Sequence, residues 1–332
     1  MKKIILFLIF GAFLFSSNTV VGDDMPETPL FYRINIDKEI GATTWRYMQK
    51  GYDEAQKAGA AAIILRLNTY GGTVVHADSI RTLILNSSMP VYAFIDNNAA
   101  SAGALIAISC DSIYMREGAN IGAATVVNQT GKAMPDKYQS YMRATIRSTA
   151  EAQGYDTVYT VSGDTEVHWR RNPQIAEAMV DERIVVPGLC DSTKVLTLTA
   201  REALQWGYCE AISESVDDII TSRLGYWQYK VEQFEPSFYD DLVGFLQNPV
   251  VQGILIMLII GGIYFEIQTP GVGFPLAVSV IAAILYFAPL YLSGLAASWE
   301  ILVFLLGIIL LVLELLVIPG FGIAGILGLI CF

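Results

Sequence analysis

Histidine and cysteine are both scarce in this chain, and their scarcity narrows the chemistry that it can perform. The 332 residues contain two histidines, His76 and His168, and four cysteines. The cysteines form no Cys-x-x-Cys pair and no cluster with histidine, so we expect neither a metal site nor another cofactor. Cys190 and Cys209 could form a disulfide in an oxidising compartment, although buried free thiols are the interpretation that we favour.

Positive charge is also limited, and it stops early in the chain. The formal net charge is -11, and no lysine or arginine follows Lys230. A nucleic-acid surface needs clustered cations, so the composition predicts no nucleic-acid partner. The same absence removes the loop cations that would indicate how C-terminal membrane helices are oriented.

Apolar stretches, in contrast, are abundant at both ends of the chain. Residues 1–22 combine two early lysines with an apolar run, as in a secretory signal peptide; an uncleaved anchor is the alternative. Residues 250–265, 275–293 and 301–318 approach the length that crosses a bilayer. We therefore predict a membrane region over 250–332 with three full spans and a truncated fourth, preceded by a linker over 221–249.

Two carboxylates in this region each precede a Pro-Gly turn. Glu266 comes before Pro270-Gly271, and Glu314 comes before Pro319-Gly320. An ionisable group at membrane depth is costly and is a candidate functional group. Alternatively, both residues mark span ends at the interface, and the sequence leaves the two interpretations open.

Residues 29–220 alternate short β-type runs with helical ones, which predicts a mainly parallel sheet flanked by helices. Catalytic loops in such folds gather where strands lead into helices. The expected strands are 31–36, 61–67, 91–95 and 112–115, and the expected helices are 40–57, 74–86, 101–109, 136–154 and 199–204.

Ser101 lies where the third expected strand leads into a short helix of small residues. Free N–H groups at a helix N-terminus suit a developing oxyanion, although serine is also a common N-cap. Gly71 and Gly72 follow the second strand, where bare backbone could donate to an oxyanion or could simply form a turn.

A serine nucleophile needs a base, and Lys137 at the start of an expected helix is our candidate. A free lysine has a pKa of about 10.4, which burial and a helix N-terminus would both lower. The alternative is an ordinary surface charge, and Lys132 in a glycine-flanked loop is a rival. Neither His76 nor His168 lies in a segment that indicates a base.

Taken together, these segments resemble the NfeD membrane serine proteases, which are relatives of the ClpP and crotonase folds. The resemblance covers nearly the whole chain. It is carried by residues 68–72, 99–103, 115–124, 135–138 and 196–203 and by the two Pro-Gly-x-Gly turns. It implies a ClpP/crotonase-like domain of repeated ββα and βα units, followed by a multi-span α-helical membrane domain.

The resemblance also implies roles for individual residues. Ser101 would be the nucleophile and Lys137 the base, while Gly72 and Ala102 would supply oxyanion N–H groups. Gly71 and Tyr70 would border the bound peptide; Tyr70 stands where the family often has proline.

By the same resemblance, the chain would be a homodimeric endopeptidase that cleaves hydrophobic segments of stomatin-like membrane proteins. It would be a multi-pass protein of the inner membrane, in contact with lipid, with its protease domain facing the periplasm or exterior. Two other functions remain as alternatives: a crotonase-like acyl-CoA enzyme, which export disfavours, and a catalytically silent scaffold that binds stomatin-like partners.

Overall fold

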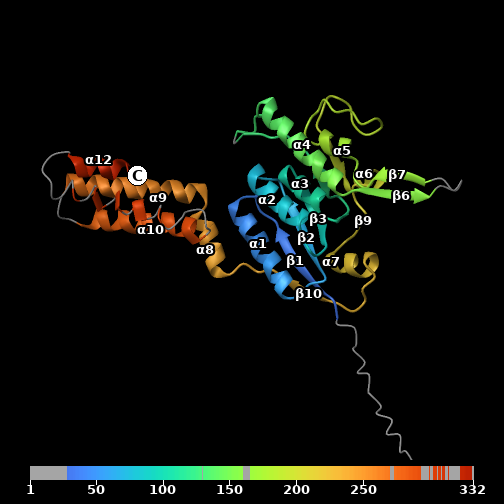
Figure 1. Ribbon diagram of the computed structural model, residues 1–332, viewed down its shortest axis with the longest axis horizontal. Helices are drawn as coiled ribbons and strands as arrows, with labels where there is room; N and C mark the ends of the chain where they lie inside the picture. The colour runs from blue at the N-terminus through green and yellow to red at the C-terminus, as the bar shows by residue number, and fades with distance from the viewer. Residues whose placement is uncertain are drawn as a thin grey trace, which may run out of the picture.

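The computed structural model describes residues 28–128, 130–159, 165–269, 273–292 and 322–330, together with 299, 302–304, 306–307, 309–310 and 313. An α/β domain is followed by a helical region, as the predicted fold class requires (Figure 1). The predicted signal peptide, residues 1–22, lies outside the described residues.

The α/β domain is built on a mainly parallel sheet with the strand order β10-β1-β2-β3-β4-β9. Its central strands are apolar on both faces, as is usual for a parallel sheet that helices cover. The strands are β1 (Leu30–Ile36), β2 (Ala62–Thr69), β3 (Val91–Ala100), β4 (Ser112–Met115), β9 (Ala211–Ile212) and β10 (Lys230–Gln233). β5 (Asn120–Gly122) pairs in parallel with the end of β3 and antiparallel with β8 (Thr197–Thr199).

Helices bury both faces of this sheet, but unequally. Alternate strand residues such as Ile63 and Leu65 join a large core with the helices of one face, whereas Ile64 and Phe94 join a smaller core on the other. The large core includes α1 (Ala42–Lys57), α2 (Val74–Leu85), α3 (Ala102–Ser109), α4 (Asp136–Ala152), α5 (Pro173–Ala178) and α6 (Ala200–Gln205); the smaller includes α7 (Val216–Asp218) and η1 (Ile219–Arg223). Every residue of α3 is buried, so this helix is a rigid support for the residue that precedes it.

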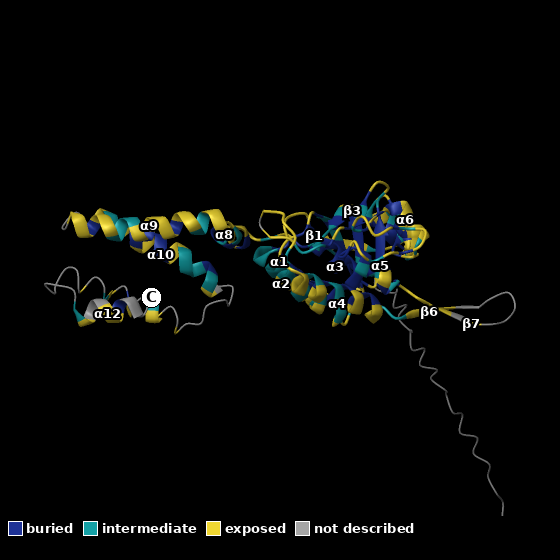
Figure 2. Ribbon diagram, turned by 90° about the horizontal axis from the view of Figure 1, so that it is seen from above, coloured by how far each residue is buried: buried dark blue, intermediate teal, exposed yellow. Residues whose placement is uncertain are grey.

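Two features of the domain were not expected from the sequence. The antiparallel hairpin of β6 (Tyr155–Tyr159) and β7 (Thr165–Trp169) projects from the domain (Figures 1 and 2). In addition, the segment 221–249 is not a simple linker, because β10 pairs with β1 and extends the sheet to residue 233. The strand was missed because Lys230-Val231-Glu232-Gln233 contains a single apolar residue.

The three cysteines in the described part of the chain, Cys110, Cys190 and Cys209, are buried free thiols. Cys190 and Cys209 therefore do not pair in this structure. Burial raises the pKa of Cys209 to about 12, which keeps this thiol protonated at neutral pH.

The helical region begins with α8 (Phe238–Leu246) and continues into α9 (Pro249–Gln268) and α10 (Phe274–Leu292). Within the described residues, α9 and α10 are long and apolar enough to cross a membrane. The predicted third span, 301–318, lies mostly outside the described residues. The predicted fourth contains the short helix α12 (Ile323–Ile330).

Glu266 has a structural role that the sequence did not indicate. Its carboxylate accepts hydrogen bonds from the backbone N–H groups of Gly273 (3.0 Å) and Leu276 (3.4 Å), and the side chain is buried. These N–H groups belong to the start of α10, where unpaired donors and the helix dipole favour a negative charge. Glu266 at the end of one apolar helix thus caps the next. Its counterpart Glu314 lies outside the described residues.

Candidate active site

Ser101 lies at the junction between β3 and α3. β3 continues past its expected end to Ala100, where it pairs with β5, and the Ser101 N–H donates to the Gly122 carbonyl (2.8 Å). The backbone of Ser101 has φ 56° and ψ -118°, a conformation that non-glycine residues rarely adopt. Backbone strain of this kind concentrates at functional sites, where the surrounding structure has to enforce it.

Glycine is required at position 71 because its backbone lies directly against this serine. Gly71 has φ 112°, and a Cβ there would come within 2.6 Å of the Ser101 Cβ and 3.1 Å of its Oγ. At Gly72, with φ 156°, a Cβ would come within 2.1 Å of the Ile40 carbonyl oxygen. The two glycines therefore let the end of β2 approach Ser101 on one side and the segment before α1 on the other.

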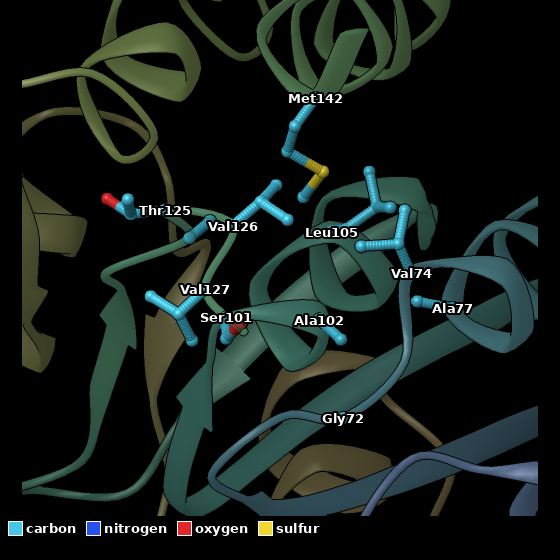
Figure 3. Close-up of a pocket in the computed structure, with 11 residues that line it drawn as sticks. Gly72, Val74, Ala77, Ser101, Ala102, Leu105, Thr125, Val126, Val127 and Met142 are labelled. Atoms are coloured by element: carbon cyan, nitrogen blue, oxygen red, sulfur yellow. The ribbon is translucent and has the colours of Figure 1, made fainter. Parts of the chain in front are cut away.

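Ser101, Gly72 and Ala102 line the same cavity of about 50 Å³ (Figure 3). Ala102 is the first residue of α3, so its N–H has no acceptor within the helix. The sequence predicted that these three residues would share a site, and the structure brings them together. The rest of the lining is largely apolar: Val74, Ala77, Leu105, Ala124, Thr125, Val126, Val127 and Met142.

Tyr70 does not line this cavity. Its side chain is 82% exposed, and it precedes Gly71 on the surface of the domain. It is accessible to a partner but makes no contribution to the walls around Ser101.

Lys137 is placed differently from the expectation that it is buried beside Ser101. It is exposed, does not line the cavity, and its amine lies 4.9 Å from the centre of the Tyr138 ring. It shares the solvent face of α4 with Tyr141, Ala144 and Ser148, at helical spacing. Met142, which does line the cavity, is about 140° away around the helix. The expectation of a desolvated amine beside the serine is therefore wrong for this conformation.

Ion pairs hold the first turn of α4 in this orientation. Arg183 donates to Asp136 (3.0 Å) and to Asp181 (2.7 Å), and Arg143 of α4 also pairs with Asp181. Hydrogen bonding by Arg183 lowers the pKa of Asp181 to about 2, against the opposing effect of its burial. The Asp181 carboxylate thus stays charged and connects α4 to the segment after α5.

Residues 124–127 line the cavity and belong to the 123–135 segment between β5 and α4, of which the structure describes all but residue 129; Gln139 fastens this segment to α4. The Gln139 side chain accepts from the Val126 N–H (3.0 Å) and donates to the carbonyls of Val126 (2.7 Å) and Met134 (3.2 Å). We refer to these three contacts as the Gln139 latch. Sequence reasoning missed Gln139, because a polar residue on a helix gives no sign of its acceptor. Sequence reasoning gave Met142 no role in the site either.

The other candidate bases also lie outside the cavity lining. His76 on α2 is half-buried, its Nδ1 lies 2.6 Å from the Thr73 hydroxyl, and burial lowers its pKa. His168 is exposed on β7, and Lys132 is exposed in the 123–135 segment. The described residues contain no cluster that could hold a metal ion.

Comparison with known proteins assigns both parts of the chain. Residues 30–170 match the N-terminal domain of NfeD1b, and residues 250–332 match the NfeD integral membrane domain. The chain is 33% identical to the membrane protein NfeD1b of Bacillus subtilis, over 97% of this chain and 69% of that protein. The chain belongs to the NfeD family. With its membrane domain and two apolar helices, it is a membrane protein.

A second relative is described as a protease. The chain is 26% identical to the membrane-bound protease PH1510 of Pyrococcus horikoshii, over 100% of this chain and 72% of that protein. A solved lysine-to-alanine mutant of the 1510-N membrane-bound stomatin-specific protease, in complex with a substrate peptide, superposes with a TM-score of 0.54. It is 26% identical and covers 66% of this chain and 98% of its own. A serine-to-alanine mutant superposes with a TM-score of 0.51 at 26% identity, covering 63% and 99%. These relatives support peptidase activity for this chain.

Proposed function

We propose that this NfeD protein is a membrane-anchored serine endopeptidase in which Ser101 is the nucleophile and Lys137 the base. The observation that carries the proposal is the strained backbone of Ser101, at the start of a buried helix and in a cavity shared with Gly72 and Ala102. The solved relatives add support, since a serine and a lysine are the residues replaced in those protease mutants.

In this mechanism the Ser101 Oγ attacks the carbonyl carbon of the scissile peptide bond, and its proton passes to the Lys137 amine. The N–H groups of Gly72 and Ala102 stabilise the oxyanion that develops. Lys137 then protonates the departing amine, leaving an acyl group on Ser101. A water molecule deprotonated by the same lysine releases that acyl group as a carboxylate.

The proposal requires Lys137 to move, because it lies on the solvent face of α4 in this structure. A cavity of about 50 Å³ has room for a few water molecules but not for a peptide with its side chains. We therefore propose that a bound peptide displaces the 123–135 segment and rotates the first turn of α4, so that Lys137 reaches Ser101. Displacing the 123–135 segment breaks the Gln139 latch, which holds this segment to α4 in the closed position.

The apolar lining favours hydrophobic residues in the substrate, and an extended peptide would lie along the backbone at Tyr70 and Gly71. Since the 1510-N protease is described as stomatin-specific, we propose a stomatin-like membrane protein as substrate. The homodimer, the three full spans followed by a fourth apolar segment, and export of the α/β domain to the periplasm or exterior remain part of this proposal.

The proposal can be tested with four purified variants and a peptide library whose products are identified by mass spectrometry. Ser101→Ala and Lys137→Ala should each abolish cleavage. The matched controls Ser148→Ala and Lys132→Ala, at exposed positions, should cleave like the parent. Cleavage by either of the first two variants at the parental rate would exclude that residue from the dyad. Loss of activity in Lys132→Ala alone would transfer the role of base to Lys132.

A further test concerns the two histidines, which the proposal leaves outside the mechanism. His76→Gln and His168→Gln should both retain most of the parental activity. If His76→Gln were inactive while correctly folded, a serine–histidine pair would replace the proposed dyad.

A further inference from the structure

The helix α8 (Phe238–Leu246) lies between the α/β domain and the membrane helices. Its short connection to α9 sets its position relative to the membrane. Two residues separate it from α9, which begins at Pro249. At the other side, the Gln247 amide donates to the carbonyl of Pro289, near the end of α10 (3.4 Å). Leu246 packs in one core with Leu255 of α9. α9 begins and α10 ends next to α8. α8 therefore lies at the ends of the two membrane helices, where lipid meets water.

The orientation of α8 agrees with this position. α8 runs across the ends of α9 and α10 instead of continuing along their direction (Figure 1). A helix that crosses the ends of membrane-spanning helices lies along the membrane plane.

One face of α8 is bound tightly to α1 of the α/β domain. Asp240 is buried and pairs with Arg46 (3.2 Å) and with Lys50, both on α1. Gly244 permits close contact, since a Cβ there would come within 2.9 Å of the Thr43 Cγ2. Through these contacts α8 and the α/β domain are connected as one unit.

The opposite face of α8 carries large apolar side chains that remain exposed in the described part of the chain. Phe238, Tyr239, Leu242 and Phe245 are 76%, 74%, 41% and 62% exposed. Their spacing of one, four and seven residues from Phe238 places them on one side of the helix. Three of the four are aromatic, and aromatic rings are enriched where the apolar interior of a bilayer meets its polar headgroups.

We propose that the aromatic face of α8 inserts into the headgroup region of the bilayer that α9 and α10 cross, so that α8 acts as an interfacial helix. The occupant of this face is lipid of the same membrane, because chain continuity already places α8 at that depth. Since α8 is bound to α1, the bilayer surface sets the height and tilt of the α/β domain, and with them the direction in which the cavity at Ser101 faces. The proposal concerns the surface of the protein and stands whether or not the chain cleaves peptides.

The test is photo-crosslinking of the full chain in nanodiscs of phosphatidylcholine and phosphatidylglycerol. The photoreactive residue p-benzoylphenylalanine replaces Phe245 in one variant and Phe238 in another. In a control variant it replaces Tyr155, an exposed aromatic residue of the projecting hairpin. All three positions are at least half-exposed, so the larger ring displaces no core packing.

Mass spectrometry should detect lipid adducts at positions 238 and 245 and only background at position 155. Equal adduct formation at position 155, or background alone at 238 and 245, would overturn the proposal. A covalent dimer formed through position 238 or 245 would also overturn it, since a second copy of the chain would then cover this face. These readouts require no peptidase activity, so their failure would leave the proposed dyad untouched.

Discussion

The Gln139 latch gives the most direct test of how the site opens. Gln139→Ala removes three hydrogen bonds between α4 and the 123–135 segment, two of them with Val126 in the cavity wall. A hydrogen bond contributes a net stability of about 0.5–1.5 kcal/mol, and bonds that share one side chain are not additive. We therefore expect the closed position of this segment to lose about 1–3 kcal/mol relative to open positions.

Hydrogen exchange followed by mass spectrometry measures this loss directly. Amides in 124–128 should exchange about 5- to 150-fold faster in Gln139→Ala, as 1–3 kcal/mol of local stability requires. Exchange in β1 to β4 should not change. A matched control is Gln153→Ala at the other end of α4, which loses a single hydrogen bond to the Ser109 carbonyl far from the wall.

The same variant separates two roles for the closed position in catalysis. If peptide entry requires the segment to open, Gln139→Ala should cleave small peptides faster than the parent, because more of the protein is already open. Faster exchange combined with slower cleavage would refute this reasoning, and would mean that the latched conformation is the one that binds substrate. Unchanged exchange would show that the latch does not hold the segment.

Three further predictions concern the support around the site. Gly71→Ala should abolish cleavage while the protein still folds, because the new Cβ would displace Ser101; parental activity in this variant would contradict the proposed geometry. Arg171→Met should lower the free energy of unfolding by about 3 kcal/mol, measured by denaturant titration, since buried Arg171 pairs with Glu210 and binds two carbonyls at the end of α3. Asp181→Asn should destabilise the protein by at most about 2 kcal/mol near pH 7. The folded-state pKa of Asp181 is lowered from 3.8 to about 2, so this difference should persist above pH 3.8 and disappear as the pH falls toward 2. A difference that grows on acidification would contradict the assigned ion pairs.

Patterns of neighbouring residues were enough to predict most of the elements that surround Ser101. Strand and helix periodicity depend on residues a few positions apart, so the expected helix 74–86 and strand 112–115 agree closely with α2 and β4. The expected strand 91–95 was too short, because Asp96-Asn97-Asn98 is polar although β3 continues through it to Ala100. Pairing with β5 holds that last part of the strand, and no local pattern indicates a partner.

In the membrane region, too, local patterns predicted the helices, whereas a contact between distant residues could not be predicted. Two apolar stretches predicted α9 and α10 to within a few residues, because length and hydropathy alone decide whether a helix can cross a bilayer. The use of Glu266 as the cap of α10 depends on the turn that brings the two helices together. The sequence placed this carboxylate at a span end without revealing its partner.

The amino-acid sequence by itself determined that an α/β domain precedes apolar helices, that two glycines follow one strand, and that Ser101 stands where another strand leads into a helix. These properties follow from periodicity and hydropathy, which act over a few residues. That Gly72 and Ala102 share a site with Ser101 was implied only by the family resemblance. Only the tertiary structure decided that β10 pairs with β1 some 200 residues earlier in the chain, that Gln139 holds Val126, and that Lys137 faces solvent. Each of these depends on which surfaces meet when distant segments pack. The face of α4 with Met142 packs inward, so Lys137, on the other side of the helix, faces solvent.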